Sequence, residues 1–193
     1  MKRLFDFLCS FAGLVALAPL MVTVAVLIKV TSKGPVLFAQ ARVGRNGRIF
    51  NVYKFRTMVD KAHTMGSSVT TGNDRRITPL GRILRKTKID ELPQIINVFR
   101  GDMSFVGPRP DVAGFADKLE GEDRKILSVR PGITGPATLK YRDEEKILSQ
   151  QPDPEKYNSE VIYPDKIRLN REYVENRGFW KDMGYIWETV FGK

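Results

Sequence analysis

The sequence predicts a mostly helical α/β protein that contains one small β-hairpin and is attached to a membrane. Three observations lead to this fold class: a long apolar run near the N-terminus, one hairpin pattern, and amphipathic helical patterns further along the chain. The length of 193 residues suits one domain. We therefore expect residues 1–30 to form a membrane segment and residues 31–193 to form a single body outside the bilayer.

The apolar run covers residues 4–28 and reads LFDFLCSFAGLVALAPLMVTVAVLI. As a straight helix it would be roughly 37 Å long, which exceeds a hydrocarbon core of about 30 Å. A cleaved signal peptide, a spanning helix and a re-entrant helix all begin with such a run. Cleavage after Ala18 is disfavoured because Pro19 would follow the cut and the apolar run continues beyond it.

The other two interpretations remain open on these residues alone. Basic residues flank the run on both sides, which conflicts with a helix that has one end on each side of the membrane; they are Lys2, Arg3, Lys29, Lys33, Arg42, Arg45 and Arg48. A re-entrant helix needs a break inside the bilayer. Ala18–Pro19 near mid-run would supply the break, because proline removes a backbone donor.

The body begins with a predicted hairpin. VLFAQARVG and IFNVYKFRTM have strand patterns, and Arg45-Asn46-Gly47 between them predicts a tight turn. Lys54 and Arg56 fall on one face of the second strand by period two. The polar segment 63–74 predicts a loop.

Helical patterns follow. Thr78 predicts an N-cap with Pro79 at the first helical position, and the basic amphipathic segment after it is typical of helices on anionic membrane surfaces. LPQIINVFRG predicts a second, apolar helix that ends near Gly101. The tail contains FWKDMGYIW, whose aromatic residues favour a bilayer interface.

The amino-acid composition restricts the partners and the kinds of catalysis that are possible for this chain. The net charge of +10 predicts an anionic partner, either a nucleic acid, a phospholipid surface or a phosphorylated small molecule. Cys9 and His63 are the single cysteine and histidine, which excludes an intramolecular disulfide, a Cys-rich zinc site and His-pair metal motifs. Catalysis would therefore use carboxylates, Arg or Lys, and a hard oxygen-ligated metal such as magnesium.

Asp90 and Glu91 stand side by side between a basic stretch and an apolar one. Asp90 could cap the following helix, with Glu91 in its first turn. Alternatively, Arg85 and Lys88 could keep both carboxylates ionised, so that one attacks phosphorus and the other holds Mg²⁺. The local sequence allows both hypotheses.

VGPRP, residues 106–110, predicts a stiff stretch, since each proline restricts itself and the residue before it. Arg109 is thus presented in a way that suits phosphate binding or stacking on a base, although a plain rigid turn would look the same. RPGITG, residues 130–135, is a second Pro/Gly loop that opens with an arginine.

In this order, the apolar segment with its proline, YKFRTM, RKTKIDELPQIINVFRGDMSFVGPRP and RPGITG resemble the bacterial sugar transferase family, the small monotopic phosphoglycosyl transferases (polyprenyl-phosphate phosphoglycosyl-1-phosphate transferases). The resemblance runs from residue 1 to about residue 138. It implies transfer of a sugar-1-phosphate from a UDP-sugar to a polyprenol phosphate such as undecaprenyl phosphate. The reaction would release UMP, pass through a covalent aspartyl phospho-sugar and require Mg²⁺, as the first membrane step of glycoconjugate assembly.

The resemblance also assigns residues by motif position. Asp90 would be the nucleophile and Glu91 the magnesium ligand, while the phosphates and nucleotide would be bound by Lys54, Arg56, Arg85 and Arg109. Residues 1–30 would form a re-entrant helix-break-helix with the break at Ala18–Pro19. Residues 31–193 would form the cytoplasmic catalytic domain, on the anionic inner face of the bacterial plasma membrane.

Two departures from the family pattern limit these inferences. Many members have Ser-Pro at the helix break, so here Ser10, Thr23 or water would have to satisfy the freed carbonyl. After RPGITG the chain continues as PATLKYRDEE, so the identity of the sugar does not follow. The tail from about residue 140 matches least and is expected to pack at the periphery, and a homodimer is neither predicted nor excluded.

Two other classes of protein share some of these features. A nucleic-acid binding module fits the positive charge, but it lacks aromatic residues interleaved as a base-stacking platform. A non-catalytic basic adaptor on the membrane surface explains the amphipathic helices, but it needs neither adjacent acids nor Pro-Arg-Pro.

Overall fold

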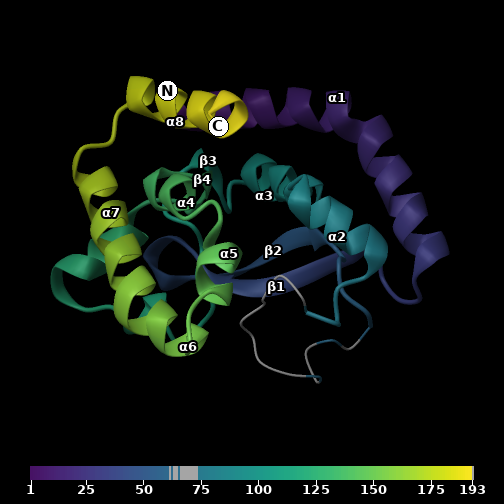
Figure 1. Ribbon diagram of the computed structural model, residues 1–193. Helices are drawn as coiled ribbons and strands as arrows, with labels where there is room; N and C mark the ends of the chain where they lie inside the picture. The colour runs from purple at the N-terminus through teal and green to yellow at the C-terminus, as the bar shows by residue number, and fades with distance from the viewer. Residues whose placement is uncertain (61, 63–64, 66–73, 193) are drawn as a thin grey trace.

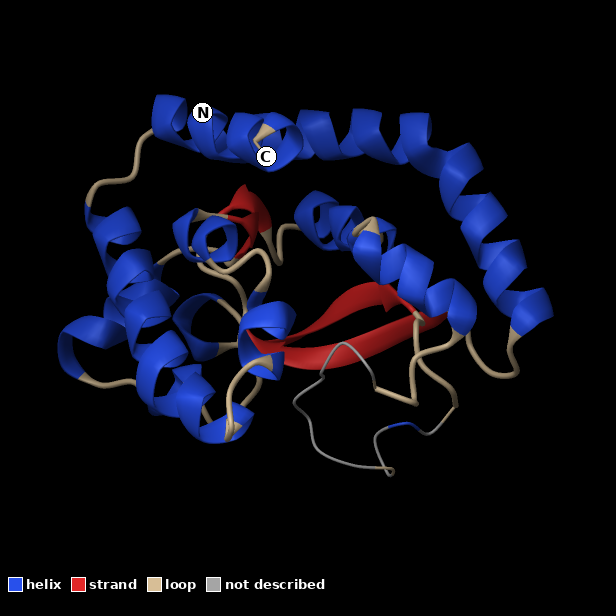
Figure 2. Ribbon diagram, viewed as in Figure 1, coloured by secondary structure: helices blue, strands red, loops and turns tan. Residues whose placement is uncertain are grey.

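The computed structural model describes residues 1–60, 62, 65 and 74–192. The loop predicted at 63–74 therefore lies almost wholly outside the described residues, as does His63. The predicted fold class is confirmed: helices predominate and the strands are few (Figure 2). The helices are α1 (Lys2–Thr31), α2 (Pro79–Lys86), α3 (Gln94–Arg100), α4 (Pro136–Lys140), α5 (Glu144–Ser149), α6 (Pro154–Tyr157), α7 (Tyr163–Glu175) and α8 (Phe179–Phe191); the strands are β1 (Leu37–Val43), β2 (Ile49–Phe55), β3 (Ser104–Val106) and β4 (Gly132–Thr134).

The apolar N-terminal segment forms one continuous helix. Figure 1 shows a bend between the two halves of α1, and the backbone stays helical through Pro19. Ala18–Pro19 lies inside this continuous helix, where a proline commonly produces a bend, so the predicted interruption of the helix at this point is not seen. The hydroxyls of Ser10 and Thr23 donate to Phe7 and Pro19 carbonyls. Neither reaches the carbonyl four residues before Pro19, so Ser10 and Thr23 are excluded as its partners, and water stays a prediction.

Most of the surface of α1 is exposed. Its buried residues are Asp6, Ser10, Val24 and Ile28, whereas many of its large apolar side chains are exposed. Within the described part of the chain, α1 alone is long and apolar enough to cross a membrane. Spanning and re-entrant helices share this length and apolar character.

The predicted hairpin is confirmed. β1 and β2 pair in antiparallel register from Leu37 opposite Phe55 to Val43 opposite Ile49. Asn46 and Gly47 in the turn have φ angles of 57° and 78°, the left-handed conformation that Asn-Gly tolerates.

Small apolar clusters fix the hairpin to the helices. Val24 and Ile28 of α1 pack with Phe55 of β2 and Leu84 of α2. A second cluster joins β2 to α3 and the segment after it through Val52, Val98 and Met103, and a third contains Val43, Ala116, Ile126, Leu127 and Ile167. The end of β2 and the α2–α3 segment are thereby held in a fixed relation.

The short parallel strands β3 and β4 bring together two motifs that are distant in the sequence. The backbone N–H of Gly132 donates to the Pro108 carbonyl at 2.8 Å, and that of Gly107 donates to the Thr134 carbonyl at 2.9 Å. A Cβ atom on Gly132 would lie 2.1 Å from the Gly107 nitrogen, so the close approach requires glycine there. VGPRP and RPGITG therefore form one rigid unit.

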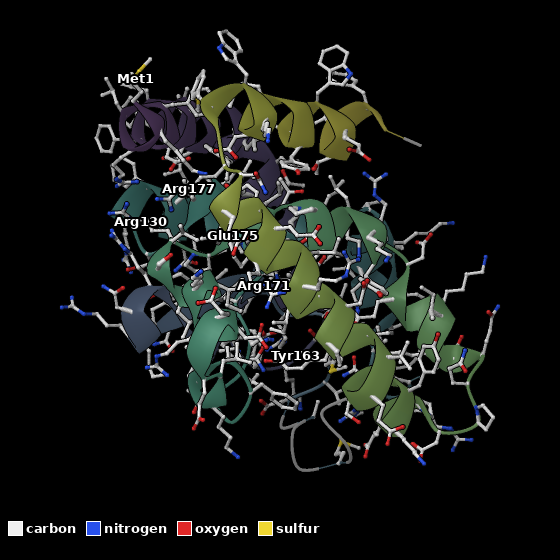
Figure 3. All side chains as sticks on the ribbon, turned by 90° about the vertical axis from the view of Figure 1, so that its left-hand side faces the viewer. Met1, Arg130, Tyr163, Arg171, Glu175 and Arg177 are labelled. Atoms are coloured by element: carbon white, nitrogen blue, oxygen red, sulfur yellow. The ribbon has the colours of Figure 1, made fainter. Side chains whose placement is uncertain are left out.

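The tail does more than cover the periphery. Lys2 Nζ donates to Asp182 Oδ2 at 2.6 Å, to the Val106 carbonyl at 2.8 Å and to the Tyr173 hydroxyl at 2.9 Å. Tyr173 donates in turn to Asp182 Oδ1 at 2.8 Å. These bonds join the start of α1 to α7 and α8, and Figure 3 shows Met1 at the level of α8.

Candidate active site

Asp90 and Glu91 lie on a short 3-10 helix, η3 (Ile89–Glu91), between α2 and α3. Thr78 caps α2 as predicted by accepting a bond from the Gly81 N–H at 2.9 Å. The left-handed Lys88, with φ of 57°, then redirects the chain. The N-cap of α3 is Pro93 and has no side-chain bond, so the hypothesis that Asp90 is a helix cap is wrong.

Glu91 is held by two cations from other parts of the fold. Its Oε1 accepts from Arg109 Nη2 at 2.6 Å and from Lys54 Nζ at 2.9 Å, while Oε2 accepts from Arg109 Nη1 at 3.4 Å. Lys54 comes from β2 and Arg109 from the Pro-Arg-Pro stretch. The structure thus brings three predicted site residues into direct contact.

The ion pairs determine the charge of Glu91. Burial disfavours its ionised form, but Arg109 and then Lys54 outweigh burial and hold the pKa of Glu91 well below its usual range. The pKa of Arg109 is raised, chiefly by Glu91. Burial and the neighbouring Arg109 lower the pKa of Lys54. Glu91 is therefore an anion that already has two partners.

Asp90 is in the opposite situation. It is 8% exposed, and its Oδ1 atom has no hydrogen-bond partner among the described residues. Burial raises the pKa of Asp90 above its ordinary value, with Lys54 opposing and Glu91 adding to the shift. Arg85 and Lys88, the two cations expected beside the pair, both lower the pKa of Asp90, but by less than burial raises it. A poorly solvated carboxylate with a free oxygen is suited to attack an electrophile.

The other two predicted residues, Arg85 and Arg56, have different surroundings. The charge of Arg85, in the last turn of α2, acts on Asp90 and lowers its pKa. Arg56 does not join the pair: β2 ends at Phe55, and Arg56 Nη2 donates to the carbonyl and hydroxyl of Ser32 at 2.9 and 2.6 Å.

Sequence reasoning missed two residues on the other strand of the hairpin. Arg42 Nη1 donates to the Pro110 carbonyl at 3.2 Å, and Arg42 Nη2 donates to Gln40 Oε1 at 2.6 Å. Alternation in FAQARV places both side chains on one face of β1. That alternation was the available signal, but which face meets the Pro-Arg-Pro stretch depends on tertiary packing.

The acidic pair could bind magnesium if waters and substrate phosphates supplied the remaining ligands. The described residues contain no group of three His, Cys, Asp or Glu side chains that could hold a metal ion. Mg²⁺ commonly uses one or two carboxylates together with waters and substrate phosphates. Glu91 and the free Oδ1 of Asp90 fit that donor set, provided that Lys54 and Arg109 release Glu91.

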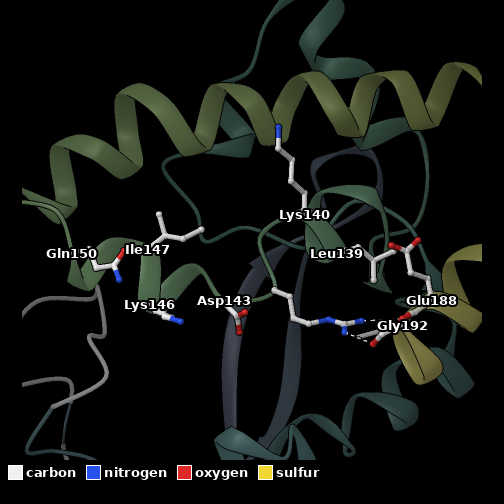
Figure 4. Close-up of a pocket in the computed structure, with 9 residues that line it drawn as sticks. Leu139, Lys140, Asp143, Lys146, Ile147, Gln150, Glu188 and Gly192 are labelled. Atoms are coloured by element: carbon white, nitrogen blue, oxygen red, sulfur yellow. Dashed lines mark hydrogen bonds between the residues drawn. The ribbon is translucent and has the colours of Figure 1, made fainter.

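A surface cavity of about 430 Å³ lies between α4, α5 and the end of α8 (Figure 4). Arg142 on its wall donates to the carbonyls of Gly192 and Glu188 at 2.7 and 2.9 Å, so this guanidinium holds the end of α8. Asp90 and Glu91 do not line the cavity. The charge of Glu144, at the start of α5, nevertheless helps to raise the pKa of Arg109. This divergent segment therefore lies near the site.

Residues 1–192 match the family described as bacterial sugar transferase. The chain belongs to this family. The match covers the tail as well as the motifs from which the resemblance was drawn, so the C-terminal helices are part of the family's common domain.

Several relatives share this domain. The chain is 36% identical over 197 residues to UDP-N-acetylgalactosamine-undecaprenyl-phosphate N-acetylgalactosaminephosphotransferase of Aeromonas hydrophila, covering 98% of the chain and 42% of the relative. It is 39% identical over 196 residues to undecaprenyl-phosphate glucose phosphotransferase of Komagataeibacter xylinus, covering 98% of the chain and 35% of the relative. It is 45% identical over 147 residues to exopolysaccharide production protein PSS of Rhizobium leguminosarum bv. phaseoli, covering 72% and 74%. The chain thus spans less than half the length of the first two, whose names give different sugars.

Proposed function

We propose that this chain transfers a sugar-1-phosphate from a UDP-sugar to a polyprenol phosphate, with undecaprenyl phosphate as the acceptor. The observation that carries the proposal is the buried Oδ1 of Asp90, which has no partner among the residues that the structure describes, beside the carboxylate of Glu91, which binds Arg109 and Lys54. Membership of the family supports it, as do relatives whose names include undecaprenyl phosphate and a sugar phosphotransferase activity.

In the first step, Asp90 acts as the nucleophile. A carboxylate oxygen forms a bond to the phosphorus that carries the sugar, and the bond from that phosphorus to the oxygen bridging to the uridine-bearing phosphate breaks. UMP leaves with the electron pair. The product on the protein is a mixed anhydride, an aspartyl phospho-sugar.

In the second step, the acceptor restores Asp90. A phosphate oxygen of the polyprenol phosphate bonds to the same phosphorus, and the bond to Asp90 breaks, so the carboxylate leaves as an anion. The lipid product is a polyprenyl diphosphate sugar. The two displacements use one nucleophile and need no redox partner.

The cations at Glu91 prepare the site for the diphosphate. Arg109 presents a planar pair of donors on a stiff stretch, and Lys54 presents a point charge from β2. A substrate phosphate would compete with Glu91 for both, and the released Glu91, next to Asp90, would then be the residue to hold Mg²⁺. When bound, Mg²⁺ would neutralise charge on the diphosphate oxygens.

Peptide mass spectrometry of the protein after reaction tests the proposal. The protein in detergent with Mg²⁺ is mixed with a panel of UDP-sugars but no acceptor, quenched and digested. We expect a phospho-sugar adduct on the peptide that contains Asp90, together with stoichiometric UMP. A non-catalytic membrane adaptor would release no UMP and carry no adduct, and that result with every UDP-sugar would overturn the proposal.

We further propose that the protein is monotopic and is attached to the cytoplasmic face of the inner membrane by a re-entrant α1. The exposed apolar side chains of α1 support it, as does α8, where Trp180 and Trp187 are 83% and 66% exposed. Tryptophan favours the interface between lipid and water. An anionic inner leaflet would also suit the net charge of +10.

Cysteine labelling tests this membrane topology. In a Cys9→Ser background, one cysteine is placed in a short extension before Met1 and another at the exposed Lys33. A membrane-impermeant maleimide applied to inside-out vesicles should label both positions, while intact cells should protect both. Labelling of the two positions from opposite sides would show that α1 spans the bilayer.

A further inference from the structure

The Pro-Arg-Pro stretch is held by donors from outside itself. Pro108 and Pro110 have no N–H, and the carbonyls of Pro108, Pro110 and the following Asp111 accept bonds from distant residues. Gly132 N–H donates to the Pro108 carbonyl, Val43 N–H donates to the Asp111 carbonyl, and Arg42 Nη1 donates to the Pro110 carbonyl. Of these three bonds, the one from Arg42 is the one that comes from a side chain, so a side-chain substitution can remove it without altering the backbone.

Arg42 is itself fixed on the hairpin. Gln40 Oε1 accepts from its Nη2 at 2.6 Å. Gln40 lies opposite Val52, and Phe38 lies opposite Lys54. Because directly opposite residues of an antiparallel pair project to the same face, Gln40, Arg42 and Lys54 share one face of the hairpin. This face supplies the Lys54 contact to Glu91 and the Arg42 contact beside Arg109.

The charged groups that act on Arg42 include Arg109 and Glu91 of the candidate site. Burial lowers the pKa of Arg42, and the neighbouring Arg109 lowers it further, while Asp111 and Glu91 oppose both effects. Arg42 and Arg109 are therefore close enough to repel. With the guanidinium of Arg42 engaged by Pro110 and Gln40, this repulsion favours an Arg109 that points toward Glu91, its observed partner.

We propose that Arg42 is a positioning residue for the donor substrate: by holding the Pro110 carbonyl, it directs the Arg109 guanidinium toward the nucleotide diphosphate. Gln40 supports Arg42 in this role. The inference rests on the proposed function, specifically on Arg109 as a ligand of the UDP-sugar. Arg42 itself need not touch the substrate.

A double-mutant cycle tests this inference. Arg42→Met keeps the apolar stem and removes both donors, and Arg109→Met does the same at the partner. We expect Arg42→Met to raise the KM for the UDP-sugar about tenfold with less than a threefold change in kcat. We expect Arg109→Met to raise KM further, and the double variant to be no worse than Arg109→Met alone.

Arg45→Met is the matched control. Arg45 stands on the same hairpin and its Nε donates to the Ser128 carbonyl at 3.1 Å, away from the Pro-Arg-Pro carbonyls. We expect its KM and kcat to stay within about twofold of wild type. Thermal unfolding of every variant is recorded. If Arg42→Met does not fold, Arg42→Lys replaces it in the cycle, with a smaller rise in KM.

The outcomes separate the inference from the proposed function. Losses that add fully in the double variant, or an unchanged KM in folded Arg42→Met, would show that Arg42 only packs the hairpin and would overturn the inference. An unchanged KM in Arg109→Met would instead remove Arg109 from the proposed donor site, and the inference with it. A rise in KM that disappears in the Arg109→Met background supports positioning.

Discussion

Two acidic side chains, Asp182 and Asp90, are both buried but are bonded differently. Asp182, at 3% exposure, uses both carboxylate oxygens: Oδ2 accepts from Lys2, and Oδ1 accepts from Tyr173. Asp90, at 8% exposure, leaves Oδ1 without a partner among the described residues. Buried polar atoms are nearly always hydrogen-bonded in native proteins. The unsatisfied carboxylate is therefore the one to associate with chemistry, and the satisfied one with holding the helices together.

Glu91 combines features of both side chains. Like Asp182, it is fully engaged, and like Asp90, it lies at the site. Its partners, however, are the cations that we assign to substrate phosphates. Glu91 therefore stabilises the substrate-free arrangement with bonds that the substrate is expected to replace. The following variants test this division between structural and reactive carboxylates.

The largest effect is expected at Asp90. Asp90→Asn should lower turnover by about 10⁴-fold or more, because an amide cannot carry the phospho-sugar. The adduct on its peptide should be absent in the mass spectrum. Full activity in the folded variant would exclude Asp90 as the nucleophile.

The stability of the same variant should not fall. Since the folded pKa of Asp90 is raised, its contribution to stability is present below about pH 3.8, the unfolded value, and is lost as the pH rises through the folded pKa. At neutral pH Asn should therefore be at least as stable, as measured by thermal unfolding. In the wild type, the rate of adduct formation should fall on acidification at a pH above the ordinary aspartate range.

Glu91→Gln should have the next largest effect, about 100-fold on kcat/KM in saturating Mg²⁺. Unlike Asp90→Asn, it should also lower thermal stability at neutral pH, because Lys54 and Arg109 lose their anionic partner. Glu91 has a depressed pKa, so its stabilisation is present above the ordinary glutamate value and is lost as the pH falls. Equal stability of the wild type and variant at pH 7 would contradict this role for the ion pairs.

Asp182→Asn should show the reverse pattern. The loss of a charged partner for Lys2 and Tyr173 should lower the free energy of unfolding by about 2 kcal/mol, and thermal unfolding should register this loss. The turnover of the folded fraction should stay within about threefold of wild type. A 100-fold loss of turnover without destabilisation would place Asp182 among the reactive groups.

Arg109→Lys should have the smallest effect, a rise of several-fold in the KM for the UDP-sugar. Lysine keeps the charge but loses the planar fork that makes two bonds to one partner. A titration of UDP-sugar from below to above the wild-type KM measures the effect. Identical curves would show that the bidentate geometry is not used.

Local chemistry explains where sequence-based prediction succeeded. The Asn-Gly turn, the Thr78 cap and the end of α3 at Gly101 follow from backbone preferences of a few adjacent residues, and the structure has all three. Period two grouped Arg56 with Lys54, but the sequence did not reveal that the Arg56 guanidinium bonds Ser32. Asp90 was offered as a helix cap because local sequence does not reveal that Lys88 turns the chain before α3 begins.

The sequence by itself determined the membrane-seeking apolar segment, the hairpin and the presence of adjacent acids beside basic residues, since each is a property of neighbouring side chains. The tertiary structure alone decided that Arg109 and Lys54 meet at Glu91, that Arg42 holds the stretch carrying Arg109, and that Asp90 keeps a free oxygen. Those contacts join residues far apart in the chain. Their formation depends on how β1–β2, η3 and the β3–β4 pair pack together, and burial and pKa are consequences of that packing.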